Sequence, residues 1–243
     1  MENNAFSPEQ ADAIKSILGN REGEEYVKIA LPSNGLEYSK EVEIRPFTFA
    51  DEKFALKHDV KKSDFMNVLM SRCIKEVDID SLFICDKAFL IQKLKEISTG
   101  PEINMNIECE ACDTENSLTI DLRLLNIKEV PEGTEYPFTF RLGVLDKDIV
   151  VRPGKVRDEA QMASFELLSN NLWRYIESIN EVDDKPVISE VVPKLPVADG
   201  HQIMKKVSMS DYGVESSFFY VCTTCGNKQE TEVPLTANFF GKA

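Results

Sequence analysis

The sequence has no apolar stretch long enough to cross a membrane. A transmembrane helix needs about 20 consecutive apolar residues, and no run in this chain of 243 residues approaches that length. The opening, Met-Glu-Asn-Asn-Ala, also lacks the basic start and apolar block of a secretory signal peptide. We therefore expect a protein of a reducing cytoplasm with no membrane partner. In that compartment, cysteine pairs are more often metal ligands or redox centres than disulfides.

Basic residues are scarce relative to acidic ones. The chain has 28 Lys and Arg against 42 Asp and Glu, which gives a net charge of -14. Affinity for nucleic acids comes mainly from Lys and Arg side chains that displace counterions from phosphates. The charge balance therefore argues against a nucleic-acid partner, although it does not exclude a local basic patch.

Histidine is also rare, and the usual signatures of catalysis are missing. The only histidines are His58 and His201, each in polar sequence. A catalytic cysteine needs a base such as His beside it. The sequence has no phosphate-binding loop, dinucleotide fingerprint or metalloprotease motif. We predict no enzymatic activity and no small-molecule substrate.

Two Cys-x-x-Cys motifs are the most informative feature that is present. Cys109 and Cys112 form the first pair, Cys222 and Cys225 the second, and an alternating strand-like segment follows each. Four thiolates suit a tetrahedral Zn²⁺ site, so we predict one structural zinc ion held by all four. The alternatives are two separate disulfides or redox pairs, or reduced thiols without metal. The two remaining cysteines, Cys73 and Cys85, are predicted to be small core residues.

A short amphipathic helix is predicted over residues 7–19. Ser7 is a suitable N-cap, Gln10 completes a capping box and Gly19 ends the segment. A helix of this length is marginal alone, so it must dock on its own domain or on a partner. We expect its apolar stripe to bind another protein or a second copy of the chain through Ile14, Ile17 and Leu18.

The rest of the chain predicts an α+β fold. A hairpin over 26–48 turns at Asn34-Gly35, helices dominate 51–98, and strands surround the first cysteine pair. The second part repeats this order. We expect strands near 138–142 and 149–151, a long helix over 158–179, a loop over 180–196, a short helix that begins at Asp199 and ends at Gly213, and strands around the second pair.

Matched positions indicate an internal duplication. Arg152-Pro153 and Asp158-Glu159 follow Arg45-Pro46 and Asp51-Glu52 by 107 positions. Each arginine is expected to pair with the following acids. Asp199, Gly213 and the second cysteine pair follow Asp86, Gly100 and the first pair by 113 positions, so we place a six-residue insertion within 180–196.

This pattern divides the chain into three parts. We predict an N-terminal helix and linker over 1–25, a first repeat over 26–130 and a second repeat over 131–243, packed as pseudo-symmetric halves that each carry a zinc-knuckle hairpin. Asp86 and Asp199 are expected to cap helix N-termini. Gly100 and Gly213 are expected to end helices with positive φ.

The first repeat resembles a known family. Leu31-Pro32-Ser33-Asn34-Gly35, Arg45-Pro46 and Asp51-Glu52 resemble a baseplate protein family of T-even-type contractile-tailed bacteriophages, which includes a baseplate hub protein and a hub assembly factor. Asp113 departs from the Cys-x-x-Cys-Gly form of the first knuckle. The positions that carry the resemblance are Pro32, Ser33, Gly35, Arg45 and Pro46.

The resemblance implies a non-enzymatic structural or assembly protein of a tail baseplate. Its location would be the virion tail, or the host cytoplasm during assembly, and its partners would be other baseplate or tail proteins or itself. The alternative is a zinc-ribbon protein that binds nucleic acid or acts in transcription. That reading requires a basic face around the cysteines, and Lys228 is the only basic residue near either pair.

Overall fold

The protein is a mixed α+β chain whose computed structural model describes residues 7–18, 25–57 and 62–234. Its helices are α1 (Pro8–Leu18), α2 (Phe49–Lys57), α3 (Lys62–Cys73), α4 (Ile84–Thr99), α5 (Glu159–Met162), α6 (Phe165–Asn171), α7 (Lys185–Val191) and α8 (Val197–Ser208). Its strands are β1 (Val27–Ala30), β2 (Glu41–Ile44), β3 (Ile74–Lys75), β4 (Glu102–Glu108), β5 (Glu115–Asp121), β6 (Ile127–Lys128), β7 (Phe138–Arg141), β8 (Asp148–Val151), β9 (Ile176–Ile179), β10 (Gly213–Val214), β11 (Ser217–Val221) and β12 (Lys228–Glu232). Within the described ranges, every helix is too short or too polar to cross a membrane.

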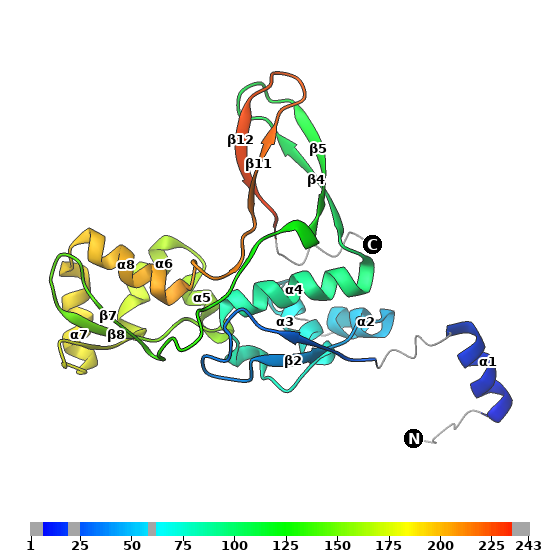
Figure 1. Cartoon of the computed structure of the whole chain (residues 1–243), viewed down its shortest axis with the longest axis horizontal. Helices are drawn as coiled ribbons and strands as arrows, with labels where there is room; N and C mark the ends of the chain where they lie inside the picture. The colour runs from blue at the N-terminus through cyan, green and yellow to red at the C-terminus, as the bar shows by residue number, and fades with distance from the viewer. Residues whose placement is uncertain (1–6, 19–24, 58–61, 235–243) are drawn as a thin grey trace.

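The predicted hairpin over 26–48 is confirmed as β1 and β2. These strands pair antiparallel, and β3 adds to the other edge of β2 to give the order β1-β2-β3. Alternation sets the two faces of this sheet. Val42 and Ile44 are fully buried on the inner face, whereas Glu41 and Glu43 point outward. Helices α2, α3 and α4 lie beside this sheet in the body of the molecule (Figure 1).

A second antiparallel sheet has the order β7-β8-β9, with Ile149 and Val151 fully buried. It corrects the prediction of one long helix over 158–179. The helix is interrupted because the Ser164 hydroxyl accepts the Leu167 N–H and caps a new helix, α6. The segment then changes to strand β9, whose pairing with β8 outweighs the helical periodicity of the sequence.

The segment 180–196, predicted to be a loop, contains helix α7. The Asp184 side chain accepts the Val187 N–H, and Pro186 occupies the first turn, where it needs no N–H donor. A turn of 3-10 helix follows over Val192–Lys194. Local capping chemistry therefore builds a helix in a segment whose Pro and Asp content favours a loop.

The predicted helix caps are partly wrong. Helix α4 begins at Ile84 and α8 at Val197, so Asp86 and Asp199 lie inside the first turns, where both are completely buried. Gly100 ends α4 with a φ of 95°, as predicted. By contrast, α8 ends at Ser208, before a left-handed Met209.

Gly213 serves close packing rather than a helix end. It has a φ of 90° in β10, and a Cβ atom there would lie 2.9 Å from the Cys85 Cβ. Strand β10 pairs with β6 and so joins the two parts of the chain at this point.

Two apolar cores share the body. One gathers mainly the residues of β1–β3, α3 and α4, and the other gathers those of β7–β9 and α6–α8. Each core also contains residues from the other part of the chain. Val156 and Val233, from the second part, lie in the first core, and Phe83 and Val130, from the first part, lie in the second core. Cys73 and Cys85 are buried in these cores, as predicted. This shared packing joins the two parts of the chain.

A pair of hairpins projects from this body. Figure 1 shows β4–β5 and β11–β12 rising side by side, with the loops of both hairpins meeting at the far end. We call this projection the arm. Helix α1 is drawn apart from the body, at the side opposite α6, α7 and α8 (Figure 1).

Candidate metal centre

The two cysteine turns at the tip of the arm have the same backbone design. Cys109 N–H donates to the Thr114 carbonyl, and the Cys109 carbonyl accepts the Asp113 N–H at 2.8 Å. Likewise, Cys222 N–H donates to the Asn227 carbonyl, and its own carbonyl accepts the Gly226 N–H at 3.0 Å. The matching of these bonds shows that the motif aims both sulfurs of each pair in the same way.

The residue after each second cysteine is left-handed. Gly226 has a φ of 73° and Asp113 a φ of 55°. Glycine adopts this region freely, and Asp is among the few other residues that enter it. The departure from a Cys-x-x-Cys-Gly pattern in the first turn therefore leaves the turn geometry intact.

The four sulfurs predicted to share a site do converge. Cys109 Sγ lies 3.7 Å from Cys225 Sγ, and Cys112 Sγ lies 3.7 Å from Cys222 Sγ. All four lie within 4.8 Å of one another. Thiolates at the corners of a tetrahedron about 2.3 Å from a zinc ion are roughly 3.8 Å apart. The cluster is thus compact enough to hold one metal ion, and both short distances cross between the hairpins.

Hydrogen bonds around the cluster stabilise thiolates at two positions. Hydrogen bonds from the backbone N–H groups of Cys225 and Thr224 lower the pKa of Cys222 to about 6. A hydrogen bond with the Thr114 hydroxyl lowers the pKa of Cys112. The Asn227 N–H lowers the pKa of Cys225, but the neighbouring sulfurs outweigh it and raise that pKa to about 12. This is the behaviour of thiols close enough to share negative charge, which a cation would neutralise.

Asn116 is a further member of the site that the sequence did not reveal. It is only 2% exposed, and its Nδ2 donates to Cys222 Sγ at 3.6 Å and to the Thr114 carbonyl. Its Oδ1 accepts from both the N–H and the hydroxyl of Thr223 at 3.0 Å. One side chain from β5 therefore holds the other hairpin's turn and orients a candidate ligand. The only signal in the sequence is that Asn116 alternates with Leu118 and Ile120, which places it on the same face of a strand.

Further bonds join the hairpins below the sulfurs. The Glu108 carbonyl accepts from Tyr220 Oη and from Gln229 Nε2, each at 3.4 Å. Gln229 Oε1 accepts the Glu110 N–H at 3.1 Å. Together with the bonds of Asn116 to Thr223, these contacts join the two hairpins beside and below the sulfur cluster.

The surface near the cysteines is acidic. Lys228 is the one basic residue in the tip segments 108–116 and 221–229. Its ammonium lies 4.5 Å from the centre of the Phe219 ring. The same segments carry Glu108, Glu110, Asp113 and Glu115.

The residues of the family motif lie in the body, away from the cysteines. Ser33 N–H donates to Asp86 Oδ1 at 2.9 Å, and the Pro32 carbonyl accepts the Val130 N–H at 2.8 Å. Asn34 and Gly35 have φ values of 55° and 79°, so together they supply the left-handed positions of this turn. The Leu-Pro-Ser-Asn-Gly segment therefore anchors the loop between β1 and β2 to helix α4 and to the connection between the two parts.

Arg45 and Pro46 have a related structural role. The Arg45 guanidinium donates to the Pro46 carbonyl and to Asp51 at 2.7 Å, and in the second part Arg152 pairs with Asp158 at 2.9 Å. Both predicted arginine–aspartate pairs are thus present. They fasten the end of each central strand to the segment that follows it.

Helix α1 has the predicted capping box. Ser7 N–H donates to Gln10 Oε1 at 2.9 Å, and Gln10 N–H donates to Ser7 Oγ at 3.2 Å. Ile17 is 82% exposed and Leu18 is 50% exposed. The side chain of Ile14 lies outside the described part of the structure.

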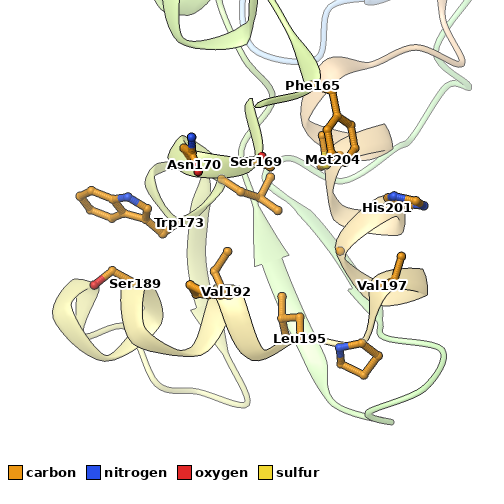
Figure 2. Close-up of a pocket in the computed structure, with 14 residues that line it drawn as sticks. Phe165, Ser169, Asn170, Trp173, Ser189, Val192, Leu195, Val197, His201 and Met204 are labelled. Atoms are coloured by element: carbon orange, nitrogen blue, oxygen red, sulfur yellow. The ribbon is translucent and has the colours of Figure 1, made fainter. Parts of the chain in front are cut away.

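The histidines show no catalytic arrangement in the part of the chain that the structure describes. His58 lies outside it. His201 is exposed on α8, with its ring 5.9 Å from that of Phe165. It borders a mainly apolar groove of about 410 Å³ between α6, α7 and α8 (Figure 2). No cysteine lines that groove, so His201 does not share a cleft with Cys73 or Cys85.

The fold and the site together define a class: a mixed α+β protein with two β-hairpins joined at their tips by four cysteines. A family model described as "T4 bacteriophage base plate protein" matches residues 24–241. Because this match covers most of the chain, the protein belongs to that family, as the Leu-Pro-Ser-Asn-Gly segment indicated. A search of curated proteins and a search of solved structures each gave no significant match.

Proposed function

We propose that this protein is a zinc-binding, non-enzymatic structural or assembly component of the hub of a bacteriophage tail baseplate. The observation that carries the proposal is the family match over residues 24–241. A baseplate protein acts through contacts with other tail proteins, and it is found in the virion tail or with its partners during assembly. The hub is our choice within the baseplate because the motif around Ser33 and Gly35 resembles that of hub proteins.

We also propose that the chain arose by duplication, with repeats over 26–130 and 131–243 after an N-terminal segment over 1–25. Each proposed repeat contains a three-stranded antiparallel sheet, then a helix with a buried aspartate, then a hairpin with a Cys-x-x-Cys turn. Equivalent backbone bonds support the match. Arg45 N–H donates to the Cys73 carbonyl, and Arg152 N–H donates to the Tyr175 carbonyl. The extra residues of the second repeat then fall in the segment that contains α7.

Zinc is the metal that the donor set fits best. Four thiolates with sulfur separations of 3.7 Å across the hairpins match tetrahedral zinc, whereas Ca²⁺ and Mg²⁺ prefer oxygen ligands. The ion would be coordinated by Cys109, Cys112, Cys222 and Cys225, with Asn116 behind Cys222. Because each repeat contributes one pair, the bound ion would link the repeats, and its binding energy would contribute to folding.

The acidic tip argues against the alternative of a zinc-ribbon protein that binds nucleic acid. Such a protein needs cations that approach phosphates, but the tip segments hold one lysine among several carboxylates. We likewise propose no membrane partner and no small-molecule substrate.

Metal analysis tests the zinc site. Purified full-length protein should contain about one zinc ion per chain, as measured by elemental mass spectrometry. The variants Cys112→Ser and Cys225→Ser should each lose most of this zinc. Cys85→Ala is the matched control, because Cys85 is a buried thiol in the second apolar core of the body and does not belong to the arm. A zinc content near zero in the freshly purified wild type contradicts the proposal.

Phage genetics tests the baseplate role. In the phage that encodes the protein, deletion of the gene should give particles or lysates without complete baseplates in electron micrographs, and the wild-type gene supplied in trans should restore them. Proteomics of purified virions then separates a resident component from an assembly factor. Normal baseplates in the deletion strain contradict the proposed role.

A further inference from the structure

A cationic pocket opens on the first sheet, in the body of the molecule and away from the sulfur cluster at the tip of the arm. It has a volume of about 500 Å³, and its lining includes Tyr26, Arg45, Thr48, Asp51, Arg72 and Lys75. Three of these side chains are cations and one is an anion, in a chain whose net charge is -14. Cations gathered against the overall charge of a protein focus an attractive field on an anionic ligand.

The Asp51 carboxylate in this pocket already accepts hydrogen bonds from neighbouring side chains and backbone. Asp51 is buried and accepts hydrogen bonds from the guanidinium groups of Arg45 and Arg72, both at 2.7 Å, and from the N–H and hydroxyl of Thr48. Burial alone would raise the pKa of Asp51, but these donors outweigh it and hold the pKa well below its usual range. Asp51 therefore orients the two arginines and cannot neutralise the rest of the pocket.

Two of the cations keep unused donors. Arg72 uses only its Nε in the pair with Asp51, and within the described residues no acceptor meets its two terminal nitrogens. The Lys75 ammonium lies 3.6 Å from the centre of the Tyr26 ring, and no acceptor among the described residues meets it either. Glu43 pairs with Lys75 across the strands but forms no ion pair with it there.

Aromatic rings hold these cations in place. The Arg72 guanidinium lies 4.3 Å from the centre of the Phe54 ring, and Lys75 rests on Tyr26. Such contacts already restrict these long side chains before a ligand binds, so less conformational entropy is lost on binding. The donors are thus oriented in advance, toward a pocket open to solvent.

We propose that this pocket binds an oxyanion, and that its ligand is a carboxylate on an acidic segment of a protein partner. Guanidinium and ammonium donors form short, charge-assisted bonds with carboxylates. The pocket already accommodates one carboxylate, that of Asp51, between the same two arginines. Partner proteins are the ligands that a baseplate component meets, and the net charge of -14 repels a singly charged carboxylate less than it repels a polyphosphate.

The second sheet provides an internal comparison. Arg152 and Asp158 occupy the places of Arg45 and Asp51, but the β8–β9 register shifts there, so that Glu177 and Ser178 together stand where Lys75 follows Ile74. The Arg174 Nε is directed to Asn171 Oδ1 at 3.0 Å. An acid and a serine, neither of them a cation, thus stand in place of the lysine there, which confines the proposed site to the first sheet.

Binding of short peptides to the full-length protein tests the site. Titration with tetraglutamate should give saturable shifts of the backbone NMR signals around Arg72 and Lys75, and tetraglutamine should give none. Lys75→Glu, which reverses the charge of this side chain, should weaken tetraglutamate binding by about tenfold or more. Lys28→Glu is the matched control, since Lys28 lies opposite Glu43 on the same outer face but does not line the pocket, and it should change the affinity less than about twofold.

The outcomes separate the explanations. Tetraglutamate binding that is lost in Lys75→Glu but kept in Lys28→Glu supports the proposal, whether or not inorganic phosphate also binds. Equal losses in both variants would show unspecific attraction and overturn it. Phosphate binding without tetraglutamate binding overturns the carboxylate assignment, and binding of neither probe overturns the site. Unchanged circular dichroism of Lys75→Glu excludes misfolding as the cause, and none of these results depends on zinc or on the hub.

Discussion

Asp86 and Asp199 occupy matching places in the two parts of the molecule, but they are bound differently. Each lies in the first turn of its helix, and each is completely buried. Asp86 accepts from Ser33 N–H at 2.9 Å and from the Tyr38 hydroxyl at 2.5 Å. Asp199 accepts from the N–H groups of Val144 and Leu145. Both aspartates therefore hold the first hairpin loop of their sheet against the helix.

The difference comes from the loops. The loop between β1 and β2 is longer than that between β7 and β8, and its added residues supply Tyr38. The Tyr38 hydroxyl also accepts the Phe83 N–H at 2.8 Å, and its ring lies 5.2 Å from that of Phe83. The loop near Asp199 instead exposes Val144 and Leu145 to solvent. The contact between the aspartate and the hairpin loop is thus covered by other side chains in the first part, whereas in the second part it lies next to solvent.

Removing these aspartates gives the largest expected effects. Asp86→Ala leaves a buried N–H and a buried hydroxyl without an acceptor, so it should lower the free energy of unfolding by about 3 kcal/mol. Asp199→Ala should cost only about 1–2 kcal/mol, because water can reach the released N–H groups. Urea unfolding measures both. Glu132→Ala, at an exposed ion pair with Lys40, should stay within about 0.5 kcal/mol. An equal or larger loss for Asp199→Ala would contradict the comparison.

The arginine-bound aspartates give a smaller contrast that depends on pH. At pH 7, Asp51→Asn should cost about 2 kcal/mol and Asp158→Asn about 1 kcal/mol, because Asp51 binds two arginines and Asp158 one. The folded-state pKa of Asp51 is lowered, so its stabilisation is present above the unfolded pKa of about 3.9. It is lost as the pH falls through the folded-state value.

The free energies of unfolding of the wild type and Asp51→Asn should therefore begin to converge below about pH 4 and draw closer as the pH falls further. Only the difference between the two proteins is diagnostic, because other carboxylates also become protonated in acid. A difference that stays constant down to pH 2 would show that the carboxylate charge is not the cause.

Much of the site could be predicted from the sequence because its signals are local. A Cys-x-x-Cys turn fixes two sulfurs within four residues, and the capping box of α1 spans only Ser7 to Gln10. The pairs of Arg45 with Asp51 and of Arg152 with Asp158 join residues six positions apart. In each case the residues that interact are also near in sequence, so residue type and spacing sufficed.

The errors arose where distant contacts decide the structure. Asp86 looks like a helix cap, but its acceptor role depends on Ser33, which lies 53 positions away. The segment of β9 continues the helical periodicity before it, and only pairing with β8 makes it a strand. Asn116 contacts Cys222 across 106 positions. Residue spacing in a single sequence does not reveal contacts between such distant positions. Local propensity therefore predicts the wrong structure where tertiary contacts decide it.

Deletion of residues 1–20 should give the smallest change in stability and the clearest change in assembly. Ile17 and Leu18 are largely exposed, so their loss removes little buried apolar surface. We expect the melting temperature to change by less than about 1 °C and the metal content to be retained. The truncated protein should nevertheless fail to restore baseplates to the deletion phage, because an amphipathic helix that lies apart from the described body (Figure 1) is suited to bind a partner. Full-length protein with Ile17→Asp and Leu18→Asp should behave like the truncation, whereas Glu9→Gln on the same helix should behave like the wild type. A fall of several degrees in the melting temperature would place the helix in the core and remove its proposed role in docking.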